Sequence, residues 1–307
     1  MTVTTTMPQI TPRRGRAMGM MVFSSVTISF GGLILRFMQE ADAWQIAFWR
    51  SWGVIGVIGA FLFWRYGADA LGRVRAVGRP GLLAGLMMSG STIGFLQSIT
   101  HTTVANTLFM LSAIPFVTAI LARVFLGERL RRDTALTMVA AIVGVGVMVA
   151  GGIGGGALYG NLMGLFTAVC FSGYAIMVRR HRGIEMLPTL LIAAGIVIVT
   201  SGAMRWGDLA IPAGDLGRSL FIGGVLSALA NVLFIAAARQ LVAAEVTLFM
   251  LLEFALGPVW VWLVVAEAPS NPTIVGGVIV IGAVTARALS EISQNRRRRP
   301  GARLRPH

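Results

Sequence analysis

The sequence predicts an all-α membrane protein of ten transmembrane helices, arranged as two inverted repeats of five helices each. Three observations lead to this fold class: the composition, the lengths of the apolar runs, and residues that recur about 140 positions apart. Hydrophobic residues make up 56% of the 307-residue chain and charged residues only 12%, whereas a soluble domain usually carries about 25% charged residues. The apolar excess is therefore expected to face lipid.

The apolar runs have the length of transmembrane helices. A helix of about 20 apolar residues spans a bilayer core, whereas strands of membrane barrels are about 10 residues long and alternate in polarity. Two runs are long enough for two helices each: residues 80–122 break at the polar stretch 97–103, and residues 134–178 break at the glycine-rich stretch 151–156, because dense glycines favour a turn. The other six expected helices cover residues 17–35, 43–64, 186–204, 219–238, 246–266 and about 273–286.

The arginines favour one orientation in the membrane. The chain has 26 arginines and no lysine. With the N-terminus in the cytoplasm, 21 of the 26 fall in cytoplasmic segments, Arg36, Arg205 and Arg218 fall outside, and Arg50 and Arg123 lie within helices. Because cytoplasmic loops carry the positive charge of membrane proteins, we expect a bacterial inner-membrane protein with both termini in the cytoplasm. Its arginine-rich tail is expected to contact anionic lipid, not nucleic acid.

Residues of the second half repeat those of the first. The letters TLFML occur at Thr107–Leu111 and again at Thr247–Leu251, and Ser91 and Asn231 coincide at the same shift of 140. Each half holds five expected helices, so the second half enters the membrane from the opposite side, as in many secondary transporters. The expected organisation is a cytoplasmic tail at 1–16, a first repeat at 17–152, a second repeat at 157–288 and an arginine-rich cytoplasmic tail at 289–307.

Two prolines lie deep inside expected helices, at corresponding places in the two halves. Pro115 and Pro258 are 143 positions apart. A proline inside a helix removes a backbone hydrogen bond and kinks the helix, and matched interruptions in two halves point toward a transporter's binding site. We interpret both prolines as helix hinges. The alternative is that prolines are simply frequent in membrane helices.

One segment resembles the EamA-like branch of the drug/metabolite transporter superfamily. It runs from Thr102-Thr103-Val104-Ala105-Asn106 through Pro115 to Leu126-Gly127-Glu128-Arg129, and it is similar to that family's helix entry, mid-helix proline and terminal Gly-Glu. The resemblance covers residues 17–290. It implies ten helices and transport of a small metabolite, with export favoured over import.

Further positions support the resemblance, and others depart from it. Arg50 and Glu253 stand where members of the family commonly carry Arg and Glu. In the family that Glu is commonly followed by Pro, whereas here Phe254 follows, and Ala266-Glu267 stands in place of a second Gly-Glu. These departures concern the geometry of the ninth expected helix, and the resemblance names no substrate.

Glu253 and Arg50 are the leading candidates for a substrate site. A charge near the centre of the bilayer is costly, and it persists where it faces a cavity or a partner. Glu253 could take up a proton and couple transport to the proton gradient, or it could bind a cationic part of the substrate. Arg50 has the planar donor fork that suits a carboxylate or a phosphate. The alternative is a structural Arg–Glu pair that holds two helices together.

Other side chains inside the expected helices or at their edges complete the candidate substrate site. They are Ser91, Asn231, Tyr174, Gln97 and Trp49. Hydrogen bonds between helices explain the polar ones equally well, and an aromatic belt at the membrane interface explains the tryptophan. No cofactor or metal is expected, because the three histidines are scattered and the single cysteine, Cys170, lies in an apolar run.

The sequence thus predicts a secondary transporter rather than an enzyme. It would move a small metabolite, amino-acid-like or drug-like, by alternating access, with proton coupling and a homodimer left open. One alternative is a polytopic membrane enzyme acting on a lipid-linked substrate, although the chain has no cluster of acid, base or metal ligands. The other is a lipid flippase without a soluble substrate.

Overall fold

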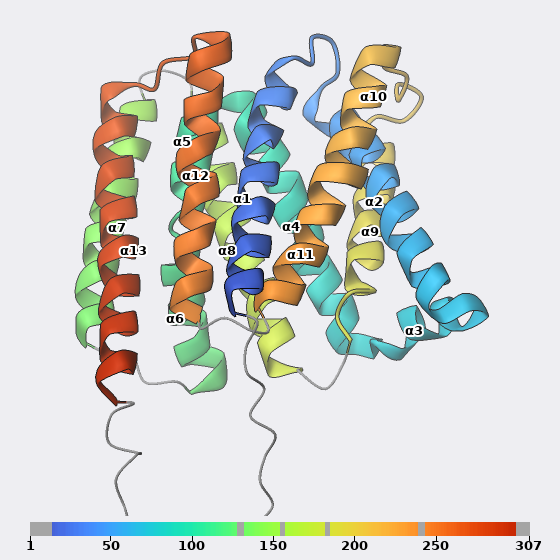
Figure 1. Cartoon of the computed structure of the whole chain (residues 1–307). Coiled ribbons are helices and arrows are strands. Elements are labelled where there is room, and N and C mark those ends of the chain that lie inside the picture. Colours follow the sequence, from blue (N-terminus) through green and yellow to red (C-terminus); the bar gives the residue numbers. More distant parts are fainter. Residues whose placement is uncertain (1–13, 128–131, 154–156, 182–184, 239–242, 299–307) are drawn as a thin grey trace, which may run out of the picture.

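The computed structural model describes residues 14–127, 132–153, 157–181, 185–238 and 243–298, and within them the chain forms helices and no strands (Figure 1). The elements of the first half are α1 (Arg14–Arg36), α2 (Ala43–Tyr66), η1 (Gly67–Asp69), α3 (Ala70–Ala76), α4 (Gly78–His101), α5 (Val104–Leu111), α6 (Ile114–Leu126) and α7 (Arg132–Ile153). Those of the second are α8 (Leu158–Arg180), α9 (Thr189–Met204), α10 (Ala213–Phe221), η2 (Ile222–Ser227), α11 (Ala228–Ala238), α12 (Ala243–Val265) and α13 (Asn271–Arg298).

The predicted class, an all-helical membrane protein, is confirmed. Within the described ranges, six helical segments are long and apolar enough to cross a membrane: Arg16–Arg36, Ala43–Ala76, Gly78–His101, Val104–Leu126, Leu158–Val178 and Ala213–Leu233. Four shorter apolar helices accompany them: Leu136–Gly151, Thr189–Met204, Phe249–Val265 and Asn271–Ala286. The count of ten spans stays a prediction.

Local capping explains where several helices begin and end. Asp42 caps α2 by accepting from the Gln45 backbone N–H at 2.8 Å, while the Gln45 side chain accepts from the Asp42 N–H at 3.0 Å, which is a capping box. Ser270 caps α13, because its hydroxyl accepts from the Thr273 N–H at 3.3 Å. This helix runs to Arg298, beyond the expected end at 286, since no Gly or Pro interrupts residues 283–298. Residues 299–307 and the expected turn at 154–156 lie outside the described residues.

The two prolines sit in different local structures. The regular α-helix is interrupted at Ser112–Ala113, whose backbone stays in the right-handed helical region, and Pro115 is the second residue of the helix that follows, α6. Proline is tolerated in a first helical turn, where its missing N–H would have no partner. Pro258 instead lies inside α12, which continues through it. The expected hinge role is a prediction that this geometry leaves open.

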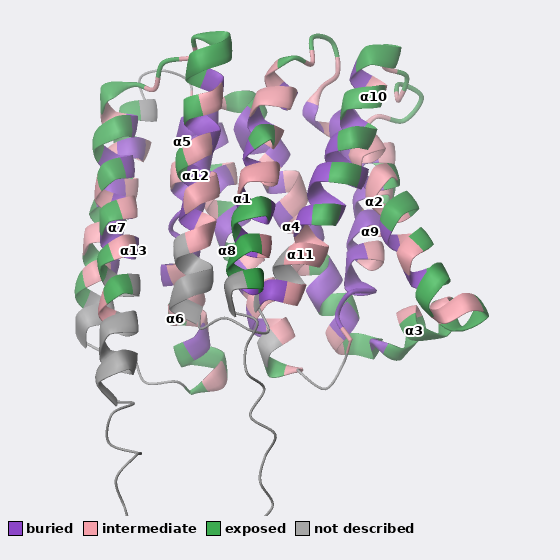
Figure 2. Cartoon of the chain, in the orientation of Figure 1, coloured by how far each residue is buried: buried purple, intermediate pink, exposed green. Residues whose placement is uncertain are grey.

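The first helix of each half packs into the other half. In the first half α1 contacts α11 and α12, and in the second half α8 contacts α4, α5 and α6. Further pairs that cross between the halves include α2 with α9, α4 with α9, α2 with η2, α7 with α13, and α5 with α12. In Figure 1, α7 and α13 form one edge of the bundle and α2 lies at the other. Exposed residues line the outside of these edge helices (Figure 2), and they include the large apolar side chains Trp64, Leu136 and Val278.

Glycines set the closest helix contacts. A Cβ atom on Gly53 of α2 would lie 2.8 Å from the Gly224 nitrogen of η2, so the two backbones touch there. At the edge of the bundle, a Cβ on Gly144 of α7 would lie 2.7 Å from the Gly276 carbonyl oxygen of α13. Small residues are typical of membrane helices that pack backbone to backbone.

Substituting Gly144 by valine is therefore expected to push α7 and α13 apart. Overpacking of this kind costs about 1–3 kcal/mol, so the melting temperature of the detergent-solubilised protein should fall. The matched control is Gly146→Val, because no atom lies within 4 Å of a Cβ at that exposed position. Equal melting temperatures for the two variants would contradict the close α7–α13 contact.

Candidate functional site

A cavity lies among α2, α4, α9 and the η2–α11 segment. Its volume accessible to water-sized molecules is about 40 Å³. Since about 10–15 Å³ is enough for one water molecule, the cavity has room for a few waters. Met88 and Thr92 reach it from the middle of α4, so the cavity lies well inside the bundle. Its lining residues are Arg50, Val54, Ile58, Met88, Thr92, Leu190, Ala193, Ala194, Val197, Ser227, Ala228 and Asn231.

Arg50 is the only charged residue in this lining. Its Nη2 donates to the Ser227 hydroxyl at 2.9 Å, and its Nε is buried without a hydrogen-bond partner. Within the described part of the chain Arg50 forms no ion pair. The cavity therefore contains a cation that only neutral protein groups contact.

Arg50 and Asn231, which are both predicted site residues, line the same cavity. Ser227 also lines it and was not predicted. Asn231 lies one helical turn beyond Ser227 and donates from Nδ2 to the Ser227 carbonyl at 2.7 Å. Residues 222–227 form a π-helix, a local widening that often occurs at functional sites. Ser227 could have been found from its spacing of four residues before Asn231, which puts both on one helix face.

The remaining predicted residues lie elsewhere. Ser91 is buried on α4 beside the lining residue Thr92, and Gln97 is buried 6 positions further along, outside the lining. Tyr174 lies on α8, with its ring centroid 6.1 Å from that of Phe171. Trp49 donates from Nε1 to the Leu209 carbonyl at 2.8 Å, so it anchors the α9–α10 linker.

Glu253 is half-buried on α12, and its carboxylate has neither a hydrogen-bond nor an ion-pair partner among the described residues. It shares a helix face with Gly257 and Trp260, which follow one and two turns later. That face contacts α1: the Trp260 Nε1 donates to the Ser29 hydroxyl at 3.0 Å, and the Trp260 ring stacks on Phe30 with centroids 5.0 Å apart. Because Gly257 also lies against Leu108 of α5, Glu253 is on the side of α12 that faces α1 and α5.

Arg50 and Glu253 do not form an ion pair with each other. The helices that carry them have different neighbours: α2 packs against α4, α9, α10 and η2, whereas α12 packs against α1, α5 and α13. The alternative of a structural Arg–Glu pair between these two residues is therefore wrong. The two charges belong to separate environments within the bundle.

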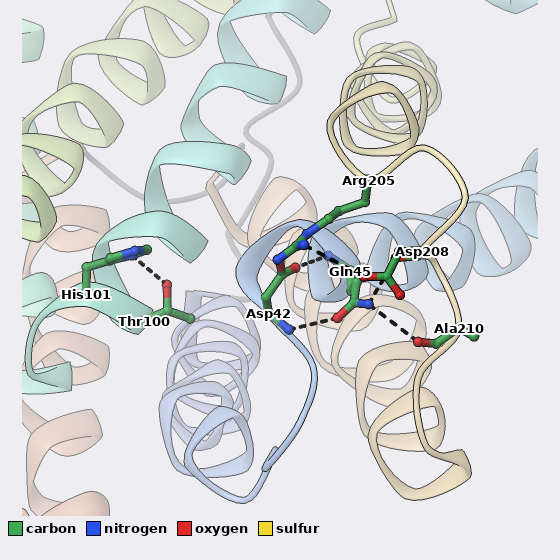
Figure 3. Close-up of polar contacts among 7 residues, drawn as sticks. All are labelled: Asp42, Gln45, Thr100, His101, Arg205, Asp208 and Ala210. Atoms are coloured by element: carbon green, nitrogen blue, oxygen red, sulfur yellow. Dashed lines mark hydrogen bonds and ion pairs between the residues drawn. The ribbon is translucent and has the colours of Figure 1, made fainter.

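A second set of polar contacts closes one end of the bundle, the upper end in Figure 1. Arg205, after α9, pairs with Asp42, while Gln45 donates to the Asp208 carbonyl at 3.0 Å and to the Ala210 carbonyl at 3.4 Å (Figure 3). These contacts tie the α9–α10 linker of the second half to the start of α2 in the first half.

Two further contacts join the halves at the same end. The buried Asp215 carboxylate of α10 accepts from three consecutive backbone N–H groups, Gln39, Glu40 and Ala41, at 3.2–3.3 Å. The second is an ion pair between Arg36 Nε of α1 and Glu267 Oε2 after α12, at 2.6 Å. We call Arg36–Glu267, Asp42–Arg205 and Asp215 with residues 39–41 the linker latch.

The Arg36–Glu267 pair is also bound to the α4–α5 junction. The Arg36 Nη2 donates to the Thr102 carbonyl at 2.8 Å, and Glu267 Oε1 accepts from the Val104 N–H at 2.8 Å. Val104 begins α5, so the carboxylate lies at a helix N-terminus, where negative charge is favoured. One ion pair thereby holds three segments together.

An apolar cluster lies on the other side of the cavity. Ile58, Leu62, Leu187, Leu190 and Ala228 are buried against one another, and Ile58, Leu190 and Ala228 also line the cavity. Just beyond them, the Tyr66 hydroxyl donates to Glu185 at 2.6 Å. Aliphatic packing thus separates the cavity from the end of the bundle that carries α3.

A bundle of long apolar helices defines a multi-pass membrane protein. Residues 15–150 match the EamA-like transporter family. The chain is 28% identical to the pseudopaline exporter of Pseudomonas aeruginosa over 273 residues, which are 86% of this chain and 93% of that protein. It is 24% identical to the riboflavin transporter of Brucella anthropi over 246 residues, which are 78% of this chain and 85% of that protein.

The fold has a counterpart among solved structures. One crystal structure superposes with a TM-score of 0.64 over 90% of this chain and 98% of its own, at 16% identity, a likeness that concerns the fold alone. The family match and the two relatives indicate a membrane transporter rather than an enzyme. The family match covers residues 15–150, and the two relatives extend the similarity over most of the chain, so the chain is similar to the EamA-like transporters of the drug/metabolite transporter superfamily.

Proposed function

We propose that the protein is a secondary transporter that moves a small organic solute across the bacterial inner membrane by alternating access. Ten spans form two inverted halves, with both termini in the cytoplasm and export as the favoured direction. The named activities of the two relatives, pseudopaline export and riboflavin transport, support a small organic solute as the cargo.

The observation that carries this proposal is the pattern of helix packing. Exchanging the halves replaces α1 by α8, α11 by α4, and α12 by α5–α6. The contacts of α1 with α11 and α12 then become the contacts of α8 with α4, α5 and α6, and both sets are present. Two halves with equivalent packing suit alternating access, in which one half moves against the other around a central site.

The two ends of the bundle supply gates of different chemistry. The linker latch is the proposed periplasmic gate, and its contacts join the first half to the second. The cluster around Leu62 and Leu187, together with the Tyr66–Glu185 hydrogen bond, is the proposed cytoplasmic gate. Arginine counting favours this orientation, because the predicted cytoplasmic residues Arg65, at the end of α2, and Arg73 and Arg75, on α3, belong to the apolar-cluster end.

Glu253 is the proposed site of proton coupling. Its carboxylate has no partner among the described residues, and a carboxyl group inside a transmembrane bundle marks a proton or ion pathway more often than a structural contact. Protonation would remove its charge while the adjoining α1 and α12 move. Arg50, Ser227 and Asn231 form the proposed solute site; Ser91, Gln97, Tyr174 and Trp49 would support it from outside the cavity.

A flux assay tests the proposed function. Purified protein is first screened for thermal stabilisation by small organic solutes, riboflavin included, and the stabilising solutes are then followed across proteoliposome membranes with and without a pH gradient. We expect protein-dependent flux that the gradient accelerates. A chemically altered product, or lipid scrambling without solute movement, would contradict transport and favour an enzyme or a flippase.

A further inference from the structure

We propose that the Arg50 cavity is a carboxylate subsite, which binds the anionic end of a solute that carries an aliphatic segment next to its carboxylate. This inference rests on the proposed transport function and specifies the chemical class of the cargo. It follows from the unbalanced charge of the cavity, from the free donor edge of its arginine, and from its size and lining.

The charge of Arg50 is unbalanced in the structure. None of the residues that line the cavity is acidic, and within the described residues no carboxylate pairs with the guanidinium. Removing a cation from water inside a membrane bundle is costly unless an anion or a water-filled space compensates it. The cavity provides the space, and a bound anion would provide the missing charge.

Arg50 has hydrogen-bonding capacity that the described residues do not use. Ser227 takes one hydrogen bond from Nη2, and Nε is buried without an acceptor. A guanidinium offers two parallel N–H groups on one edge, which matches the two oxygens of a carboxylate. The hydroxyl of Thr92 lies in the same lining and can donate to a carboxylate oxygen.

Size and lining limit what can enter. The open volume of about 40 Å³ fits a group of a few heavy atoms, so the cavity would hold one end of a larger solute. Arg50 is its single cation, which matches a monoanion better than a phosphate dianion. Most of the remaining lining is aliphatic: Val54, Ile58, Met88, Leu190, Ala193, Ala194, Val197 and Ala228. This surface suits methylene groups next to the carboxylate.

The test compares three probes that differ only in their head group. Valerate has a carboxylate on a short aliphatic chain, valeramide is its neutral analogue, and butyl phosphate has a larger, more highly charged group. We expect valerate to raise the melting temperature of the wild-type protein and to slow flux of a transported solute. Valeramide should bind on the order of 10- to 100-fold more weakly, because it lacks the charge-assisted hydrogen bonds.

Variants connect this selectivity to the cavity. Arg50→Gln should abolish stabilisation by valerate, and Arg50→Lys, which keeps the charge without the fork, should restore it only in part. Arg123→Gln is the matched control, because Arg123 is an exposed arginine within α6 and should leave valerate binding unchanged. If Arg50→Gln does not fold, the comparison of probes on the wild-type protein still decides the question.

The outcomes separate this inference from the proposed function. Equal binding of valerate and valeramide, preference for butyl phosphate, or undiminished valerate binding by folded Arg50→Gln would overturn the carboxylate subsite while solute flux continues. Absence of protein-dependent flux for every solute would overturn the transport function itself.

Discussion

Replacing Glu253 by glutamine is expected to reduce proton-driven flux by about 100-fold or more, to the level of empty liposomes. Glutamine keeps the shape of glutamate but cannot gain and lose a proton at this position. Because the carboxylate has no partner among the described residues, the substitution breaks no ion pair, so folded protein should still be recovered from the membrane. Flux in proteoliposomes with and without an imposed pH gradient measures the effect.

The control for this experiment is Asp69→Asn. Asp69 is exposed and pairs only weakly with Arg73, at 3.9 Å, so the loss of this carboxylate should leave gradient-driven flux intact. If Glu253→Gln keeps both the rate and the pH-gradient dependence of the wild type, Glu253 is neither the coupling site nor a ligand for the solute. A loss of folded protein would instead identify the carboxylate as structural.

Replacing Glu267 by glutamine is expected to open the proposed periplasmic gate. The substitution removes the ion pair between Glu267 and Arg36, and it weakens the contact with the Val104 N–H. The side chains of this pair are shielded from solvent, since Arg36 is only 25% exposed and Glu267 only 20%. A hydrogen bond to a charged group contributes about 1.5–3 kcal/mol, and about 1.4 kcal/mol is a tenfold change in a conformational equilibrium. The open population should therefore rise about tenfold or more.

Cysteine labelling measures this opening. Cys170, buried on α8, is replaced by serine, and Thr92 of the cavity lining is replaced by cysteine as the reporter. In right-side-out vesicles, a membrane-impermeant thiol reagent should label the reporter about tenfold faster with Glu267→Gln than without it. The control is Arg73→Gln, which breaks a pair at the opposite end of the molecule. Equal acceleration in both variants would refute a periplasmic latch.

The helices could be predicted from sequence because their signals are local. Long apolar runs end at charges, glycines or prolines, and Asp42 with Gln45 provides a capping box that requires only four residues. For this reason the expected second helix at 43–64 agrees closely with α2 at 43–66. The last helix runs past its expected end, because the apolar run ends near 286 while the helical backbone continues through polar residues to Arg298.

The site could be predicted only in part, because its contacts join distant segments. Arg50 and Asn231 stand out as polar residues in apolar runs, but their common cavity depends on the close crossing of Gly53 and Gly224. The separation of Arg50 from Glu253 likewise depends on which helices pack together. Asp215 was not predicted as a functional residue. Its carboxylate accepts from backbone N–H groups, and the sequence gives no signal for such contacts because every residue except proline has this donor.

The π-helix at 222–227 lets the eighth predicted span lose one residue without changing the register of the helix that follows. A π turn holds one residue more than the α turn that it replaces, so shortening the chain by one residue here would let the helix close into regular α geometry without rotating α11. The same deletion in an uninterrupted helix such as α2 would turn every later side chain by about 100°. Evolution can therefore adjust the wall of the Arg50 cavity at this turn while the outer bundle keeps its register.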